Sequence, residues 1–311
     1  MARAPHPFEG PPLPMTQRAG HFPTLRSMES HPTHLTTHDG LRLHLRHWPA
    51  GVAARGMVVL VHGLGEHSGR YEHVAAFLTA AGWHVMSFDH RGHGRSEGVR
   101  GQLGQPDDML RDLSLVIDAA RRRHLAGPLI LLGHSMGGLV AARFVAEGTM
   151  PNPAAWTRPV DGLALSSPAL AASLNGFQKL LLAVLGKLAP NLAVANGLLP
   201  EWVSRDPKVV AAYRADSLVH NRVSPKLASF ILQGGEFVRA QARRWTTPTL
   251  LLFAGRDRCV APEGSREFAR DVPVSVLTVR EFPELFHEIF NEPEQAEVLS
   301  SLGQWLAQQR A

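Results

Sequence analysis

Six short apolar runs alternate along the chain with longer segments of helical spacing, and this alternation limits the folds open to it. Uninterrupted apolar runs of this length are typical of strands whose two faces are both buried, as in a parallel sheet. Strands that alternate with helices predict an α/β fold, with a mostly parallel sheet flanked by helices. The six runs lie at 57–63, 83–90, 129–135, 162–168, 249–255 and 274–279.

Two further segments indicate single elements of this fold. Residues 106–127 begin with a proline and two acids, end with a glycine and carry apolar residues at helical spacing, which predicts a helix. The arginines near its end, 121–123, complement a helix dipole. Residues 41–48 alternate leucines with arginines and a histidine, which predicts an edge strand with one solvated face.

The regular alternation stops at about Pro168 and resumes at about Trp245. The intervening residues show several helical patterns and turn signals but no convincing strand, so we expect residues 169–240 to form an inserted helical cap. The core then comprises residues 36–168 and 241–311. Residues 1–35 are rich in proline and polar residues, which predicts a flexible N-terminal tail.

Composition excludes several classes of protein. The 32 Lys and Arg against 27 Asp and Glu give a net charge of +5, but these residues are interspersed, so nucleic acid is not an expected partner. The single cysteine, Cys259, forms no internal disulfide, which favours a cytoplasmic location. No apolar stretch approaches the roughly 20 residues that span a bilayer, and the N-terminal residues lack the apolar segment of a secretory signal. No oligomeric state follows from the sequence.

Ser135 stands where an apolar run ends and a helical pattern begins, between Gly133 and Gly137. The pattern G-x-S-x-G between a strand and a helix is typical of the nucleophile elbow of the α/β-hydrolase fold. On such a turn a strained backbone exposes the serine hydroxyl, and glycine neighbours let other backbone pass closely. The alternative is a glycine-rich turn with a capping serine.

A serine hydroxyl becomes a strong nucleophile only when a histidine takes its proton and an acid orients that histidine. In the α/β-hydrolase fold these partners follow the serine, first the acid and then the histidine. Two histidines follow Ser135 in the chain. His220 lies in the predicted cap, whereas His287 follows the last predicted strand, so we predict His287 as the base.

The acid is selected by its position relative to the strands, because functional side chains of an open parallel sheet lie outside the carboxyl ends of strands. Asp257 directly follows a strand, whereas Asp161 and Asp271 precede theirs. Glu281 also follows a strand, but it adjoins the histidine loop and is more simply a surface charge. We therefore predict Asp257 as the acid, a role compatible with an Asx turn at the same residue.

Acyl transfer also needs hydrogen-bond donors aimed at the oxygen that becomes negative. We expect them to be the backbone amides of Met136, which follows the nucleophile, and of Leu64, in the glycine-flanked turn after the first parallel strand. No cofactor or metal is predicted, because the histidines near the N-terminus straddle a tail and a strand and no cysteine or carboxylate cluster completes a site. These histidines are His31, His34, His38, His44 and His47.

Four motifs, in order along the chain, resemble the monoacylglycerol lipase and lysophospholipase branch of the α/β-hydrolases. They are HGLGEHSGRY at 62–71, FDHRGHGRSEG at 88–98, GHSMGG at 133–138 and SRDPKVVAAYRADSLVHNRVS at 204–224. The resemblance extends over most of the chain from about Thr36. It implies a triad of Ser135, Asp257 and His287 and an apolar cap over an acyl tunnel. Ser217 departs from the pattern, since relatives often have proline there.

The resemblance implies a cofactor-independent serine carboxylester hydrolase that releases a fatty acid from monoacylglycerol through an acyl-enzyme. Lysophospholipid is the alternative substrate, and another carboxylesterase, an acyltransferase or a peptidase would use the same triad. A ligand-binding receptor on this scaffold is the alternative that is not an enzyme. The apolar residues 175–195 of the cap would line the acyl site or contact a membrane peripherally, with packing onto the core as the other interpretation.

Overall fold

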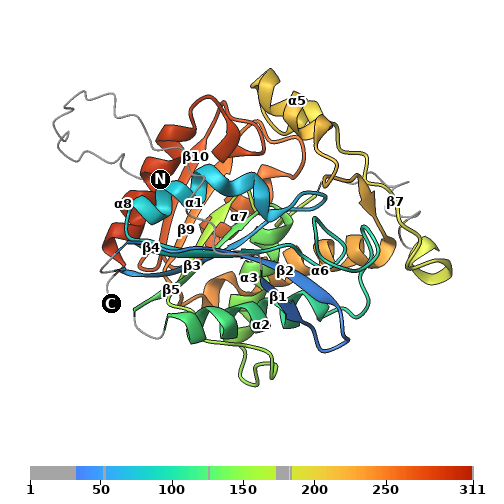
Figure 1. The fold of residues 1–311 in the computed structure, drawn as a ribbon, viewed down its shortest axis with the longest axis horizontal. Coiled ribbons are helices and arrows are strands. Elements are labelled where there is room, and N and C mark those ends of the chain that lie inside the picture. Colours follow the sequence, from blue (N-terminus) through green and yellow to red (C-terminus); the bar gives the residue numbers. More distant parts are fainter. Residues whose placement is uncertain (1–32, 52–53, 125–126, 173–181, 183, 310–311) are drawn as a thin grey trace, which may run out of the picture.

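An eight-stranded sheet organises the chain in the computed structural model, which describes residues 33–51, 54–124, 127–172, 182 and 184–309 (Figure 1). Its strand order is β1-β2-β4-β3-β5-β6-β9-β10. The strands from β4 to β10 in this order pair in parallel, while β2 is antiparallel to both of its neighbours. The strands are β1 (Thr33–Thr36), β2 (Arg42–Trp48), β3 (Gly56–Val61), β4 (Trp83–Phe88), β5 (Leu129–His134), β6 (Gly162–Ser166), β9 (Thr249–Ala254) and β10 (Leu277–Phe282).

Helices cover both faces of this sheet, which confirms the predicted α/β class. Alternate residues of β3 enter two separate cores: Val59 and Val61 pack on one face, and Val58 and Leu60 on the other. The first core is closed by α2 (Asp108–Arg123), α3 (Met136–Gly148), α6 (Pro225–Gln241) and α7 (Pro262–Asp271). The second is closed by α1 (Glu72–Ala80) and α8 (Gln295–Gln308).

Two predictions about strands are wrong. The predicted edge strand at 41–48 is β2, which lies inside the sheet because β1 pairs along it, with Thr33 opposite Leu45. β1 itself begins within the predicted tail, and residues 1–32 lie outside the described residues. The last predicted strand, 274–279, starts three residues later as β10, and it is half exposed rather than buried because it forms the other edge.

The segment between β6 and β9 contains the predicted cap. It includes η2 (Pro200–Trp202), α5 (Pro207–Ala215) and, against the expectation of no strand, the paired β7 (Val194–Ala195) and β8 (Arg222–Val223). Strands of two residues leave no local pattern, so only their pairing reveals them. Figure 1 shows α5 and β7 at the outer side of the molecule, away from the sheet, whereas α6 packs on α3.

Three more short 3₁₀ helices lie in connecting segments. They are η1 (Ser68–Tyr71), η3 (Ala242–Arg244) and η4 (Ile289–Asn291). Among the helices that the structure describes, none is long and apolar enough to cross a membrane.

Candidate active site

Ser135 occupies the sharp turn between β5 and α3, with φ of 54° and ψ of −122°. Positive φ is costly for a residue with a side chain and persists only where the surroundings hold it. Here the Ser135 amide donates to the Ser166 carbonyl at 3.0 Å, and its carbonyl accepts from the amides of Leu139 and Ala169, each at 3.0 Å. The turn is thus fixed from three sides.

The glycines beside this turn leave room for neighbouring backbone. A Cβ added at Gly137 would lie 2.2 Å from the Val61 carbonyl oxygen, and one at Gly133 would lie 2.5 Å from the Gly137 carbonyl oxygen. Both distances are far below van der Waals contact, and both partners are backbone atoms that move little. This is the close approach that the G-x-S-x-G pattern indicates.

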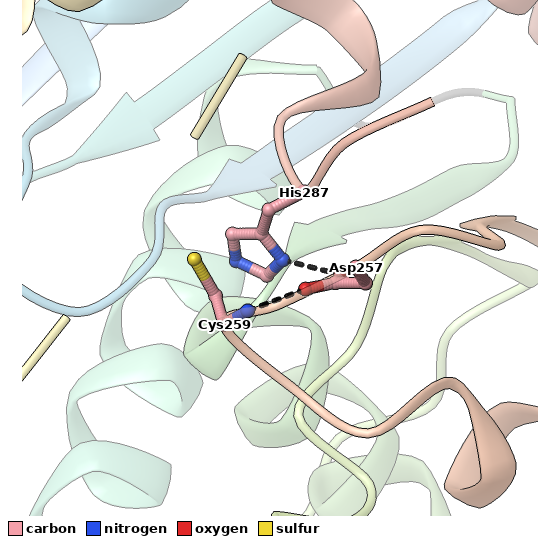
Figure 2. Close-up of side chains that lie close together, drawn as sticks. All are labelled: Asp257, Cys259 and His287. Atoms are coloured by element: carbon pink, nitrogen blue, oxygen red, sulfur yellow. Dashed lines mark hydrogen bonds and ion pairs between the residues drawn. The ribbon is translucent and has the colours of Figure 1, made fainter. Parts of the chain in front are cut away.

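The structure brings Ser135, His287 and Asp257 into one hydrogen-bonded chain. Ser135 Oγ donates to His287 Nε2 at 2.8 Å, and His287 Nδ1 donates to Asp257 Oδ2 at 2.6 Å. Figure 2 shows the Asp257 carboxylate facing the imidazole, with its other oxygen held by the following loop. That oxygen, Oδ1, accepts from the amides of Cys259 at 2.8 Å and Val260 at 3.0 Å, which is an Asx turn. The carboxylate orientation is therefore set by backbone.

Burial and charge act in opposite directions on His287. Burial of the imidazole disfavours its protonated form, but the Asp257 carboxylate outweighs this and raises the pKa of His287. The ring centroid of His134 lies 4.8 Å from that of His287, but the pKa of His134 is shifted in the opposite direction. Its burial, and then the nearby charge of His287, lower the pKa of His134 to about 3. Of these two histidines, His287 is therefore the one whose environment favours accepting a proton.

The two residues predicted to supply oxyanion amides, Leu64 and Met136, both line the cavity that contains Ser135. Met136 is the first residue of α3, so its amide has no acceptor within the helix. Leu64 lies in the turn after β3, where the neighbouring Gly63 amide donates to Glu66 Oε1 at 2.6 Å. This turn is therefore held in place by a buried carboxylate.

Ser135 lies in the wall of two cavities of different character. The larger, of about 680 Å³, has a mostly apolar lining. The smaller, of about 350 Å³, has many polar side chains. Leu64 and Leu198 line both cavities. The larger is also lined by Ala169, Ala228, Ile231 and Leu232 among others, and the smaller by Glu66, His134, Tyr213, Asp216, Asn221 and Glu288 among others.

Three charged residues beside the triad were missed by reasoning from the sequence. Arg70 Nη1 and Nη2 donate to the two carboxylate oxygens of Glu288, at 2.5 and 2.8 Å, and Nη1 also donates to Glu66 Oε2 at 2.9 Å. The available signal was the pair Glu66 and Arg70, four residues apart in the first motif of the resemblance. Glu288, directly after His287, gave no signal for their meeting.

Two groups of described side chains come close enough together to share a metal ion. One is the group drawn in Figure 2, in which Asp257 and His287 already bind each other. Burial raises the pKa of the third member, the Cys259 thiol, so the thiolate that binds metals is disfavoured. The two carboxylates of the other group already accept from the Arg91 guanidinium, whose positive charge would repel a metal cation. It consists of His38, Asp39 and Asp108.

A strained serine between strand and helix, on a mostly parallel sheet of this order, defines the chain as an α/β-hydrolase. A family model described as serine aminopeptidase, S33 (Hydrolase_4), matches residues 52–294. The chain belongs to this family, and it is a serine hydrolase.

Curated relatives and solved structures agree with this assignment. The chain is 38% identical over 271 residues to a monoacylglycerol lipase of Mycolicibacterium smegmatis, covering 86% of this chain and 93% of the relative. It is 32% identical to the phospholipase YtpA of Bacillus subtilis, covering 79% of this chain and 92% of the relative. The crystal structure of a Paleococcus ferrophilus monoacylglycerol lipase superposes with a TM-score of 0.74 at 38% identity, covering 86% and 99% of the two chains. The resemblance stated from the four motifs is confirmed.

Proposed function

We propose that this chain is a carboxylester hydrolase that releases a fatty acid from monoacylglycerol. Ser135 attacks the ester carbonyl while His287 takes the hydroxyl proton and Asp257 stabilises the imidazolium. The amides of Leu64 and Met136 bind the developing oxyanion. His287 then gives its proton to the leaving glycerol, and water attacks the acyl-enzyme through the same steps. The hydrogen bonds that join Ser135, His287 and Asp257 support these roles.

The observation that carries the substrate class is the position of Ser135 between a mostly apolar cavity and a smaller one that has more charged and polar side chains. The larger cavity has a volume of about 680 Å³, which lies within the usual range of small-molecule binding sites. An acyl chain in the apolar cavity and a glycerol in the polar cavity would meet at the serine hydroxyl. The monoacylglycerol lipases among the relatives and solved structures support the same substrate.

Lysophospholipid is the second candidate, because one relative at 32% identity is a phospholipase. The charges of the polar cavity weigh against it. The carboxylates of Glu66, Asp216 and Glu288 line this cavity, and Arg214 is the only lysine or arginine among the described lining residues. Arg70 pairs with both Glu66 and Glu288, so one guanidinium serves two of these carboxylates. A phosphodiester placed there would meet more carboxylates than guanidiniums, whereas an uncharged glycerol would not be repelled.

The test is fatty acid release from matched monoacylglycerol and lysophosphatidylcholine, with Ser135→Ala as the blank. We expect faster release from the monoacylglycerol and none above background from the variant. Faster release from the lysophospholipid would reverse the choice of substrate. A Ser135→Ala protein with undiminished activity would refute the assignment of the nucleophile.

We further propose that the cap contacts a membrane surface peripherally, in an enzyme located in the cytoplasm. Part of the apolar stretch 175–195 that is predicted to face lipid, namely 175–181 and 183, lies outside the described residues. In the described part of the cap, large apolar side chains are exposed, and Leu188 is 79% exposed. Exposed apolar side chains mark a contact site for lipid or protein where they gather on one surface, and these fall in one short stretch of the cap. The others are Val184, Leu192, Val194 and Leu199.

Cosedimentation with phosphatidylcholine vesicles tests this contact. Leu188→Asp should weaken binding, because a charge must then approach the acyl region. Val274→Asp is the matched control: Val274 is 92% exposed but lies beside the sheet edge, outside the cap. Equal binding by both variants and the unchanged protein would remove the proposal.

A further inference from the structure

Arg70 joins two separate parts of the active site through buried ion pairs. Its guanidinium binds Glu66, in the turn after β3, and Glu288, in the loop of the catalytic histidine. All three side chains are at most 10% exposed. The guanidinium carbon also lies 4.7 Å from the centre of the Tyr213 ring, which belongs to α5. We call Glu66, Arg70 and Glu288 the Arg70 cluster.

At one end, the Arg70 cluster holds the turn that carries the Leu64 amide. Glu66 Oε1 accepts from the Gly63 amide at 2.6 Å and from the Tyr71 hydroxyl at 2.6 Å. The carboxylate is thereby bonded to the residue next to Leu64, and its second oxygen is bonded to Arg70. Without Arg70, Oε2 of this buried carboxylate would lose its cationic partner, and only the two bonds to Oε1 would hold the turn.

At the other end, the Arg70 cluster holds the residue next to His287. Both carboxylate oxygens of Glu288 accept from Arg70, and Oε2 also accepts from Asn291 Nδ2 at 2.9 Å. The Glu288 backbone amide donates to the Val203 carbonyl at 2.8 Å. Residue 288 is thus fixed through both its side chain and its backbone, which limits the positions open to the His287 imidazole.

Burying three charges is costly, and a buried ion network contributes less to stability than an apolar core of similar volume. In some proteins such networks instead select one geometry from several. Two buried carboxylates share one guanidinium here, directly beside the residue that is the proposed base. Stability alone gives no reason to place such a network at this position.

We propose that Arg70 is a positioning residue for ester hydrolysis, which holds the oxyanion turn and the His287 loop at the spacing that Ser135 requires. This inference rests on the proposed roles of His287 and the Leu64 amide. Productive geometry is demanding, since a misplacement of about 1 Å can cost about 10²-fold in rate. Arg70 acts through its two carboxylates and touches no reacting atom.

Glu288 has a second effect, which is electrostatic. The base must be neutral to accept the Ser135 proton, so kcat/KM falls on the acid side as His287 becomes protonated. The Glu288 carboxylate favours that protonation, so Glu288→Gln should move the acid limb to lower pH. Among the described residues, the other ionisable groups near the His287 imidazole include Asp257 and Cys259 after β9, His134 at the end of β5, and Glu66 and Arg70 after β3.

The experiment compares Arg70→Met, Arg70→Lys and Glu288→Gln with the unchanged protein. The assay is hydrolysis of p-nitrophenyl butyrate across pH, with rates divided by the number of sites that a fluorophosphonate titrates. We expect Arg70→Met to lower kcat about tenfold to 10²-fold with little change in KM, because positioning is lost while the substrate cavity remains. Arg70→Lys keeps the charge but loses the two-pronged contact, so its kcat should lie between those of Arg70→Met and the unchanged protein.

The matched control is Asp112→Asn. Asp112 is 1% exposed and accepts from Arg91 Nε at 2.7 Å and Nη2 at 2.8 Å, so it makes the same kind of buried two-pronged pair as Glu288. That pair contacts neither the oxyanion turn nor the histidine loop. Asp112→Asn should lower the thermal unfolding temperature but leave kcat per titrated site and the acid limb unchanged.

The decisive comparison is between the double variant and the single Arg70 variant, because it measures whether Arg70 and Glu288 act together. If Arg70 and Glu288 act as one unit, the double variant Arg70→Met with Glu288→Gln should lose little more activity than Arg70→Met. Glu288→Gln that matches Asp112→Asn in kcat and acid limb would overturn the proposal, even if Arg70→Met does not fold. Failure of the proposed function is distinguishable: the unchanged protein would then cleave the soluble ester but not monoacylglycerol, and the Arg70 comparison would still be measurable.

Discussion

Replacing Asp257 by asparagine gives a prediction whose outcome follows from two backbone amides. Asp257 Oδ1 accepts from the amides of Cys259 and Val260, while Oδ2 accepts from His287 Nδ1. Backbone amides only donate, so the asparagine oxygen must take the place of Oδ1. Its NH₂ group then faces Nδ1 of His287 and donates to it.

This reversal places the histidine proton on the wrong nitrogen. Nδ1 must become the acceptor, so Nε2 carries the proton and no longer accepts from Ser135 Oγ. The base is then absent while the side-chain shape is kept. In a serine protease, the same change costs about 10⁴-fold in kcat. We expect a similar loss here, which equals about 5 kcal/mol of transition-state stabilisation.

The assay is ester hydrolysis together with the rate of fluorophosphonate labelling, and both should fall in Asp257→Asn. Asp161→Asn is the control, because Asp161 also accepts hydrogen bonds, from the Leu129 amide and Arg121, but precedes its strand. Thermal unfolding checks that both variants are folded. A folded Asp257→Asn protein within tenfold of the unchanged rate, or an equal loss in Asp161→Asn, would refute the reasoning.

Three further predictions concern the turn, the pH profile and the apolar cavity. Gly137→Ala places a Cβ 2.2 Å from the Val61 oxygen and 2.3 Å from the His62 oxygen, so urea unfolding should show a loss of about 1–3 kcal/mol; an unchanged midpoint would contradict this. The pKa of His287 is raised above its ordinary 6.5, so kcat/KM should fall as the pH drops through a midpoint above 6.5, and a lower midpoint would count against His287 as the base. Ile231→Asp puts a charge into the apolar cavity and should slow hydrolysis of long-chain esters more than short ones; equal losses across a chain-length series would exclude this cavity as the acyl site.

The chemistry-bearing residues were accessible from the sequence because their signals are local. A glycine-flanked serine between an apolar run and a helical pattern indicates a strained turn without any long-range information. The same holds for Asp257, which directly follows an apolar run. Chain order then selected His287, and the structure places its imidazole between Ser135 and Asp257, hydrogen-bonded to both.

Apart from the start of β10, the errors concern contacts between distant segments. The strand at 41–48 is internal because Thr33–Thr36, a short polar segment, pairs along it, and nothing within either segment predicts that partner. β7 and β8 were not predicted because a strand of two residues is too short to show an alternation of apolar and polar residues. Their pairing joins positions on either side of α5.

Fold class and the candidate triad therefore follow from the sequence. The spacing of apolar residues and the glycines at turns are set by neighbouring residues, and the order of the triad residues is read directly from the chain. Sheet edges, the two cavities and the Arg70 cluster follow from tertiary contacts. Arg70 and Glu288 are 218 residues apart, and they meet because the loops after β3 and β10 converge beside Ser135. Only folding brings those loops together, and the burial that results makes the charge of Arg70 a necessary partner for Glu66 and Glu288.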